Sequence, residues 1–488
     1  MGTVTSRWQG AEQVALPAQR PRRRPWERVI RVPIARPERV TVGRYQPPRP
    51  PARAPALLAL GFLATIAVGT LLLSLPVANR EGTVTPFVTA LFTATSAVCV
   101  TGLVVVDTKT FWSPFGQAVI LLLIQVGGLG FMTSSTLLLL LIGRRVSLRE
   151  RILLREAYGA TPLGGILRLT RQVAFATLLF ESLGALILFL RFGMEFSPDW
   201  ALWMAVFHSV SAFNNAGFDI IGDFRSLIGY SQDPVVALTI AVLIILGGIS
   251  FTVMVDVARE RSFRSLLLDT KVVLVTTAAL LAAGTVALLL TEYGNPATLG
   301  PMDPLAKLVN AFFMAVTPRT AGFTTLDVPQ MTQGALLLTV ALMYIGGASG
   351  STAGGIKVNT FGVLTAAVVS SMRGRNTATV FGRELPQDHV YRALTVALLA
   401  LGLVFGVTVV LALIEPFGLP QLLFEATSAF GTVGLTTGIT PDLSVEGKLL
   451  IAATMYVGRL GPLTVALALA QREKAIRYRY PEGRLKIG

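Results

Sequence analysis

The chain contains four copies of one short stretch, and a tandem repeat restricts the possible folds more than any other feature of a sequence. Each copy joins a run of mostly small, hydroxyl-bearing or aromatic residues to a turn that ends on glycine. The copies are residues 93–102 (TATSAVCVTG), 208–217 (HSVSAFNNAG), 313–322 (FMAVTPRTAG) and 425–434 (EATSAFGTVG). Their final glycines are 115, 105 and 112 residues apart, which indicates a unit of about 110 residues.

A second motif follows each copy, 23 to 29 residues after the final glycine. It reads Val126-Gly127-Gly128, Leu246-Gly247-Gly248, Ile345-Gly346-Gly347 and, in the fourth copy, Val457-Gly458-Arg459. Two motifs that recur in register indicate an internal repeat of the whole unit.

The composition places these units in lipid. The chain has 488 residues, of which 52% are hydrophobic and only 14% are charged, whereas soluble domains carry roughly 25% charged residues. Eight apolar windows are each long enough to cross a hydrocarbon core of about 30 Å. They cover residues 55–76, 114–142, 172–192, 234–256, 272–292, 333–353, 391–415 and 447–470. We therefore expect an all-α membrane protein with eight transmembrane helices.

Four further apolar segments are too short to cross a membrane, and each leads directly into a glycine turn. They are residues 86–98, 199–213, 303–316 and 419–430. Non-helical backbone at membrane depth is tolerated only where protein or a water-filled cavity surrounds it. The sequence thus predicts four tandem span–pore-helix–span repeats, with eight spans and four re-entrant pore loops around one pseudo-fourfold ion pore.

The net charge of +15 follows the predicted topology. Of the 42 lysines and arginines, 34 lie in segments 1–56, 143–172, 256–271, 357–392 and 471–488, which share one side of the membrane if the spans alternate. This positive-inside pattern places both termini in the cytoplasm and removes the need for a nucleic-acid partner.

The same reading divides the chain into six parts. We expect residues 1–54 to form a disordered, Arg/Pro-rich cytoplasmic arm, and residues 471–488 to form a basic cytoplasmic tail. The repeats between them cover residues 55–142, 143–256 (with a cytoplasmic connector), 257–371 (with a glycine-rich intramembrane loop) and 372–470.

The four turns have the chemistry of a cation filter. Rings of backbone carbonyls can replace the hydration shell of K⁺, glycine allows the backbone to face the ion, and the C-terminal end of each short helix favours a cation. The predicted filter residues are Val100, Thr101, Gly102, Asn215, Ala216, Gly217, Thr320, Ala321, Gly322, Thr432, Val433 and Gly434.

Five glycines occur in residues 346–355, at the end of the sixth window and just beyond it. Each glycine costs a helix about 1 kcal/mol relative to alanine, so we expect a break within the bilayer that forms a gate. The predicted gate residues are Gly346, Gly347, Ser349, Gly350, Ser351, Thr352, Gly354, Gly355 and Arg459. Arg459 has two interpretations, a structural ion pair or carbonyl cap, or a positive barrier in the pore.

An acidic residue follows every turn at a similar distance. These residues, Asp107, Asp219, Asp223, Asp327 and Asp442, are either ordinary loop carboxylates or an outer vestibule that concentrates cations.

The two histidines lack metal-ligand spacing. The glycine-rich run lacks the GxxxxGK[ST] order of a phosphate loop, and no catalytic triad is present, so neither an enzyme nor a nucleotide site within this chain is expected.

The four turns that end in Gly102, Gly217, Gly322 and Gly434, the break at 346–355 and Arg459 resemble the Trk/Ktr/HKT superfamily of potassium transporters over roughly residues 55–475. The chain is most like the KtrB type of membrane subunit, because the TrkH branch has two additional spans. The resemblance implies that these glycines are the filter glycines. It also implies that Gly102 is the K⁺-selecting form, since a serine there accompanies Na⁺ transport in plant relatives.

The resemblance further implies a gate at 346–355 and Arg459, a homodimer, and a cytosolic ring of KtrA/TrkA-type regulatory subunits that bind ATP or ADP. The expected function is gated, K⁺-selective uptake across the bacterial inner (plasma) membrane. Alternatives are Na⁺-coupled K⁺ symport or a Na⁺-permeable transporter, with Na⁺ as activator or co-ion. A scaffold for the ring or a carrier of organic solutes is less favoured, because all four turn glycines are intact and a carrier favours two inverted repeats.

Overall fold

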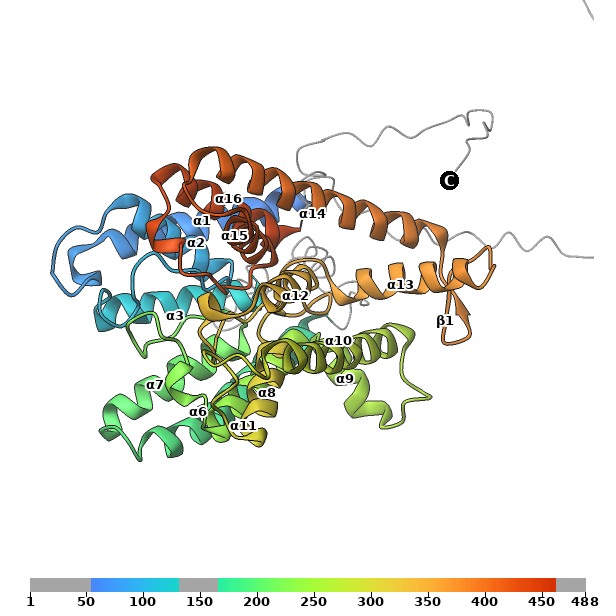
Figure 1. Ribbon diagram of the computed structural model, residues 1–488, viewed down its shortest axis with the longest axis horizontal. Helices are drawn as coiled ribbons and strands as arrows, with labels where there is room; N and C mark the ends of the chain where they lie inside the picture. The colour runs from blue at the N-terminus through green and yellow to red at the C-terminus, as the bar shows by residue number, and fades with distance from the viewer. Residues whose placement is uncertain (1–53, 131–165, 462–488) are drawn as a thin grey trace, which may run out of the picture. The chain divides into compact units, whose positions relative to one another are not determined.

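The computed structural model describes residues 54–130 and 166–461, which are mostly α-helical (Figure 1). The predicted N-terminal arm (but for its last residue), the C-terminal tail, most of the connector after the first repeat and the ends of the windows at 114–142 and 447–470 lie outside the described residues. Each of the four sequence units begins with a long helix, continues with a short one and ends with another helix.

Within the described residues, the first unit contains α1 (Ala54–Ser74), η1 (Pro76–Ala78), α2 (Phe87–Val98) and α3 (Pro114–Leu129). The second consists of α6 (Ile166–Phe192), α7 (Pro198–Phe213), η2 (Ile228–Tyr230), α8 (Pro234–Gly248) and α9 (Phe251–Glu260). The third consists of α10 (Leu268–Glu292), α11 (Pro304–Val316), η3 (Val328–Gln330), α12 (Gln333–Tyr344) and α13 (Val358–Met372). The fourth consists of α14 (Gln387–Ile414), α15 (Leu419–Gly431), η4 (Thr440–Asp442) and α16 (Val445–Leu460). A two-stranded antiparallel hairpin, β1 (Thr379–Val380) and β2 (Arg383–Glu384), joins α13 to α14.

Local sequence explains where these helices begin. A proline occupies the first turn of α3, α7, α8, α11 and α15, where its missing N–H costs nothing and its φ suits the helix. The Ser113 hydroxyl accepts a hydrogen bond from the Gly116 N–H at 3.2 Å and caps α3, and Asp233 caps α8 in the same way.

Within the described residues, three helices are long and apolar enough to cross a membrane. They are Thr170–Phe192 within α6, α10 and α14. The structure corrects the prediction of one continuous span at 234–256, because α8 ends at Gly248 and α9 leaves at an angle of 95°. The N–H groups of Thr352 and Ala348 donate to the carbonyls of Gly247 and Gly248 at 3.2 and 2.9 Å. The glycine-rich segment therefore takes over the carbonyls that a continuing helix would use.

The helices of different units contact one another in cyclic order. In each case the helix after the turn packs against the short helix of the next unit: α3 against α7, α8 against α11, α12 against α15, and α16 back against α2. This order brings the four turns, which are more than 100 residues apart along the chain, to one place.

Candidate functional site

The final glycines of the four turns lie against one another in a closed ring. A β-carbon added to Gly102 would lie 2.4 Å from the Ala216 oxygen, and one on Gly217 would lie 2.5 Å from the Ala321 oxygen. One on Gly322 would lie 2.4 Å from the Val433 oxygen, and one on Gly434 would lie 2.2 Å from the Thr101 oxygen. Each glycine thus faces the carbonyl that precedes the glycine of the next turn, and no side chain fits between them.

The four turns also share one backbone conformation. Each final glycine has a positive φ, between 69° and 96°. The residue two positions earlier is left-handed as well, although it is never glycine: Val100, Asn215, Thr320 and Thr432 have φ between 49° and 83°. Left-handed backbone is unusual for such side chains and concentrates at functional sites.

A hydroxyl-bearing residue at the end of each short helix holds the turn. Ser96 Oγ accepts from Gly102 N at 3.0 Å, and Ser428 Oγ accepts from Gly434 N at 3.1 Å. Ser211 Oγ and Thr317 Oγ1 instead donate to the carbonyls of Phe218 and Phe323 at 2.7 and 2.6 Å. These four residues were absent from the predicted site, although a hydroxyl five or six positions before each glycine is visible in the repeat.

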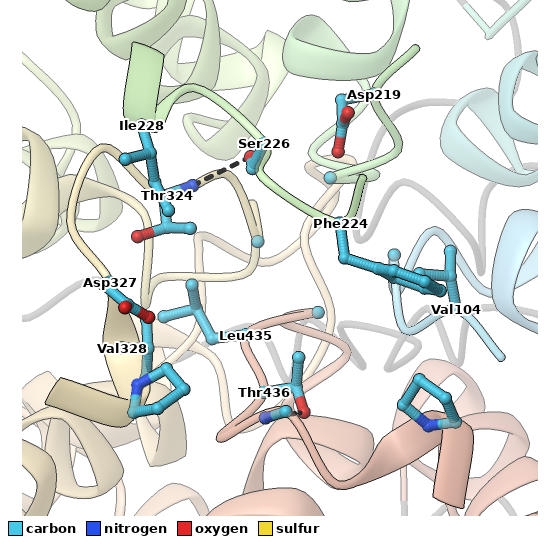
Figure 2. Close-up of a pocket in the computed structure, with 17 residues that line it drawn as sticks. Val104, Asp219, Phe224, Ser226, Ile228, Thr324, Asp327, Val328, Leu435 and Thr436 are labelled. Carbon is cyan, nitrogen blue, oxygen red and sulfur yellow. Dashed lines mark hydrogen bonds between the residues drawn. The ribbon is translucent and has the colours of Figure 1, made fainter. Parts of the chain in front are cut away.

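A cavity of about 260 Å³ opens on one side of the ring. All four final glycines line it, together with segments that follow each turn. Figure 2 shows these segments converging from four directions, with Val104 from the first unit, Asp219 and Phe224 from the second, Asp327 from the third, and Thr436 from the fourth. The ring and the cavity therefore form one continuous site.

The five predicted vestibule residues do not share one environment. Asp219 and Asp327 line the cavity. Asp107 accepts a hydrogen bond from the N–H of Phe224, a lining residue, at 3.0 Å. Asp223 and Asp442 are exposed and are not among the cavity residues. The pKa of Asp219 is raised to about 6, chiefly by burial and also by the nearby Asp107 carboxylate, while hydrogen bonds from the Ile221 and Gly222 N–H groups and the Lys109 ammonium oppose the rise.

The predicted gate segment runs without helix from Ile345 to Lys357, between α12 and α13. Its glycines are in close contact with the ring: a β-carbon on Gly354 would lie 2.0 Å from Thr432 Oγ1, and one on Gly346 would lie 3.2 Å from Thr320 Cγ2. Thr352 Oγ1 donates to the Gly247 oxygen at 2.8 Å. The segment thus packs directly against two turns and the bend after α8. We call residues 345–357 the glycine-rich loop.

Arg459 joins this loop to the first unit. Its Nη1 donates to the Thr352 carbonyl, and its Nη2 donates to the carbonyls of Gly127 and Gly128 at 2.5 and 3.4 Å. These two carbonyls lie at the C-terminal end of α3, where the helix dipole favours a positive charge. The structure therefore gives Arg459 carbonyl partners, as one of its two interpretations proposed, and none of the three ion pairs among the described residues includes it.

Three buried or half-buried charged residues near the ring were not predicted. Arg319, next to the third turn, donates to the Gly346 oxygen at 3.3 Å. Lys357 Nζ donates to the Ala353 oxygen at 2.6 Å, within the glycine-rich loop. The Glu425 carboxylate accepts from Thr437 N at 3.2 Å and Thr440 Oγ1 at 3.0 Å, and thus holds the segment after the fourth turn. Each occurs in one repeat only, so the repeat pattern gave no signal for them.

Comparison with known proteins places this chain in a family. A family model described as "Cation transport protein", TrkH, matches residues 62–478. The chain belongs to the TrkH family of cation transport proteins. The family predicted by resemblance is thereby confirmed, and the apolar helices together with this membership make the chain a membrane protein of a transporter family rather than of an enzyme family.

Two relatives and one solved structure are similar to this chain over most of its length. The chain is 42% identical to the Ktr system potassium uptake protein B of Bacillus subtilis over 89% of this chain and 96% of the relative. It is also 42% identical to the potassium/sodium uptake protein NtpJ of Enterococcus hirae, over 88% and 96%. The solved structure of the potassium transporter TrkH from Vibrio parahaemolyticus has the same fold, with a TM-score of 0.68 and 19% identity over 87% of this chain and 86% of that one.

Proposed function

We propose that this chain takes up K⁺ across the bacterial plasma (inner) membrane through a gated, K⁺-selective pore, as the ion-translocating subunit of a Ktr/Trk-type system. The observation that carries the proposal is the ring of four glycines, each against a carbonyl of the next turn. Four turns of one conformation can present backbone oxygens to a dehydrated cation from four sides. The short helices α2, α7, α11 and α15 precede the turns, so their negative C-terminal ends favour a cation there.

In this proposal the four units are span–pore-helix–span repeats with eight spans, and both termini are cytoplasmic. The twelve predicted filter residues, from Val100–Gly102, 215–217, 320–322 and 432–434, bind K⁺, and the cavity lined by Asp219 and Asp327 is the outer vestibule. The glycine-rich loop and Arg459 form the gate, because the loop packs against the third and fourth turns and Arg459, which bonds to the Thr352 carbonyl of the loop, places a positive charge beside the path.

The proposal includes partners outside this chain. The similarity to a protein named as part of a Ktr system supports a homodimer that rests on a cytosolic ring of KtrA/TrkA-type subunits. That ring would bind ATP or ADP, since we assign no nucleotide site to this chain. Neither nucleic acid nor a catalytic cofactor enters the proposal, and K⁺ is the transported ion.

A second candidate is Na⁺-coupled K⁺ symport or permeation of Na⁺, with Na⁺ as co-ion or activator. It is favoured by 42% identity to a relative named a potassium/sodium uptake protein. The two candidates differ in the driving force, because a selective pore follows the K⁺ gradient alone.

The test is Rb⁺ uptake into proteoliposomes that contain the purified chain, with and without a cytosolic nucleotide-binding subunit. We expect saturable uptake that persists without a Na⁺ gradient and a zero-current potential at the K⁺ equilibrium value. A potential that shifts with the Na⁺ gradient would favour symport. Absence of Rb⁺ uptake under every gradient, with the regulatory subunit present, would contradict the proposed function.

The gate is tested in the same assay. Arg459→Ala, or deletion of residues 350–352, is expected to raise the maximal uptake rate, because either change removes contacts that hold the glycine-rich loop in place. A folded variant that transports at or below the parental rate would argue against the gate.

A further inference from the structure

Arg319 is a buried charge beside the third turn that has no acidic partner among the described residues. Its side chain is only 7% exposed. Its Nη2 donates to the Gly346 carbonyl at 3.3 Å and to Thr277 Oγ1 at 3.4 Å, and its Nε has no hydrogen-bond partner in the described part of the chain. A small cavity of about 10 Å³ adjoins it, between α8, α10 and the glycine-rich loop.

Such an arrangement is costly, because a buried guanidinium without a carboxylate recovers little of its lost hydration energy. Within membranes, charged residues of this kind mark functional positions by default. The contact with Gly346 offers partial compensation: this carbonyl lies two residues beyond α12, at the negative end of the helix dipole.

The bond from Arg319 to the Gly346 carbonyl connects the third turn to the glycine-rich loop. Arg319 immediately precedes Thr320, the left-handed residue of the third turn, and Gly346 is the second residue of the glycine-rich loop. Thr320 itself packs against Gly346. At the far end of the same loop, Arg459 binds Thr352, and Gly354 packs against Thr432 of the fourth turn. The loop is thus fastened at both ends by an arginine and by a threonine of the ring.

We infer that Arg319 is a positioning residue that holds the start of the glycine-rich loop against the third turn, as the counterpart of Arg459 at the end of the loop. This inference rests on the proposed function for its consequence, since a loop held in this way keeps the pore closed. Displacement of the loop then requires both arginines to release their carbonyls, and a change in the third turn is passed directly to the loop.

The first experiment measures the position of the loop without measuring transport. Ala353, which is buried in the loop, is replaced by cysteine in a Cys99→Ala background of the full chain in nanodiscs, and the rate of modification by a charged thiol reagent is followed. Arg319→Gln is expected to raise this rate about tenfold, as expected when a hydrogen bond from a charged group is lost. The matched control Arg80→Gln changes an exposed arginine outside the site and is expected to leave the rate unchanged.

A milder pair of variants covers the case in which Arg319→Gln does not fold. Thr277→Val removes the other partner of Nη2, and we expect the rate to rise about threefold. Thr285→Val is the control, because Thr285 is on the same helix but bonds only to the Leu281 carbonyl of that helix. The inference is overturned if folded Arg319→Gln is modified at the same rate as the parent. If Arg319→Gln does not fold, equal rates in Thr277→Val and the parent overturn it.

Transport then separates this inference from the proposed function. In proteoliposomes, Arg319→Gln is expected to raise the maximal Rb⁺ uptake rate, and Arg319→Lys, which keeps the charge, is expected to stay near the parent. If the parent never transports Rb⁺, the proposed function fails, while a faster modification of Ala353→Cys in Arg319→Gln still supports the role of Arg319. If the parent transports and Arg319→Gln changes neither rate, the inference alone fails.

Discussion

At the scale of single residues, the ring depends on backbone conformations that side chains normally avoid. Gly102 has a φ of 89° and faces the Ala216 carbonyl of the next turn. Both facts exclude any other residue without local rearrangement, and the same holds for its three counterparts. The residue two positions earlier is left-handed without being glycine. Hydrogen bonds such as those of Ser96 and Ser428 to the final glycines connect this strained backbone to the end of the short helix.

We predict that Gly102→Ser reduces K⁺ over Na⁺ discrimination by at least about tenfold, since the added β-carbon must displace the Ala216 carbonyl and widen the ring. Permeability ratios from zero-current potentials measure the effect. Gly229→Ser is the control, because nothing lies within 4 Å of a β-carbon at Gly229. Unchanged ratios in Gly102→Ser would remove Gly102 from the filter.

Protonation of Asp219 is expected to weaken cation uptake at low pH. Its pKa is raised to about 6 by burial, so the carboxylate is charged at pH 7.5 and neutral at pH 5, and the attraction for cations is lost as the pH falls through about 6. We expect the apparent affinity for Rb⁺ to fall about fivefold, or ~1 kcal/mol for one charge near the path. In Asp219→Asn the affinity should be weak and independent of pH. The same pH profile in parent and variant would refute this role.

At the scale of elements, glycines allow the last helix of a unit to touch the end of its short helix. A β-carbon on Gly127, Gly247 or Gly458 would lie 1.8–2.0 Å from a carbonyl oxygen of the preceding short helix. The third unit lacks this contact between helices, because α12 ends at Tyr344 and the glycine-rich loop follows in place of a further helical turn. One unit has thus exchanged a regular helix contact for a non-helical segment.

We predict that Gly247→Ala destabilises the protein by about 1–3 kcal/mol, since the methyl group would overlap the Phe213 carbonyl. Gly406→Ala, in the middle of α14 with no atom within 4 Å, is the matched control and is expected to be neutral or to stabilise by up to about 1 kcal/mol. Thermal unfolding in detergent measures both. Equal unfolding temperatures would show that the close helix contact does not limit stability.

At the scale of the whole molecule, one helix joins the glycine-rich loop to the hairpin between the third and fourth units. The glycine-rich loop continues into α13, and α13 leads to β1 and β2 (Figure 1). Gly362 of α13 lies close against Val272 of α10, since its added β-carbon would be 4.0 Å from the Val272 β-carbon. The loop and the hairpin are therefore connected through α13, and α13 packs against α10.

We predict that a disulfide between Val272→Cys and Gly362→Cys, whose geometry this separation permits, fastens α13 to α10 and lowers Rb⁺ uptake stimulated by the regulatory subunit. A reductant should restore uptake, and the single-cysteine variants should not respond to oxidation. If the oxidised double variant transports like the reduced one, the gate opens without movement of α13.

Much of this molecule was predictable because local patterns set it. The repeated turns, the apolar windows and the prolines at helix starts identified the short helices to within one or two residues, and the five glycines of 346–355 indicated non-helical chain. The resemblance carried by the same residues identified the family, which the comparisons confirm. Helix propensity, apolar length and glycine conformation act over a few neighbouring residues, so the sequence expresses them directly.

The sequence is sufficient to identify four equivalent glycine turns and one interrupted helix, but the groups that meet in space follow from the folded chain. The folded chain sets the cyclic order of the turns, the bend after Gly248, the division of the aspartates between cavity and surface, and the carbonyl contacts of Arg319 and Lys357. These features depend on contacts between residues up to several hundred positions apart. The Gly247 carbonyl, for example, accepts a hydrogen bond from Thr352 instead of from the next turn of its own helix. The sequence around Gly247 does not predict this bond, because Thr352 belongs to another unit.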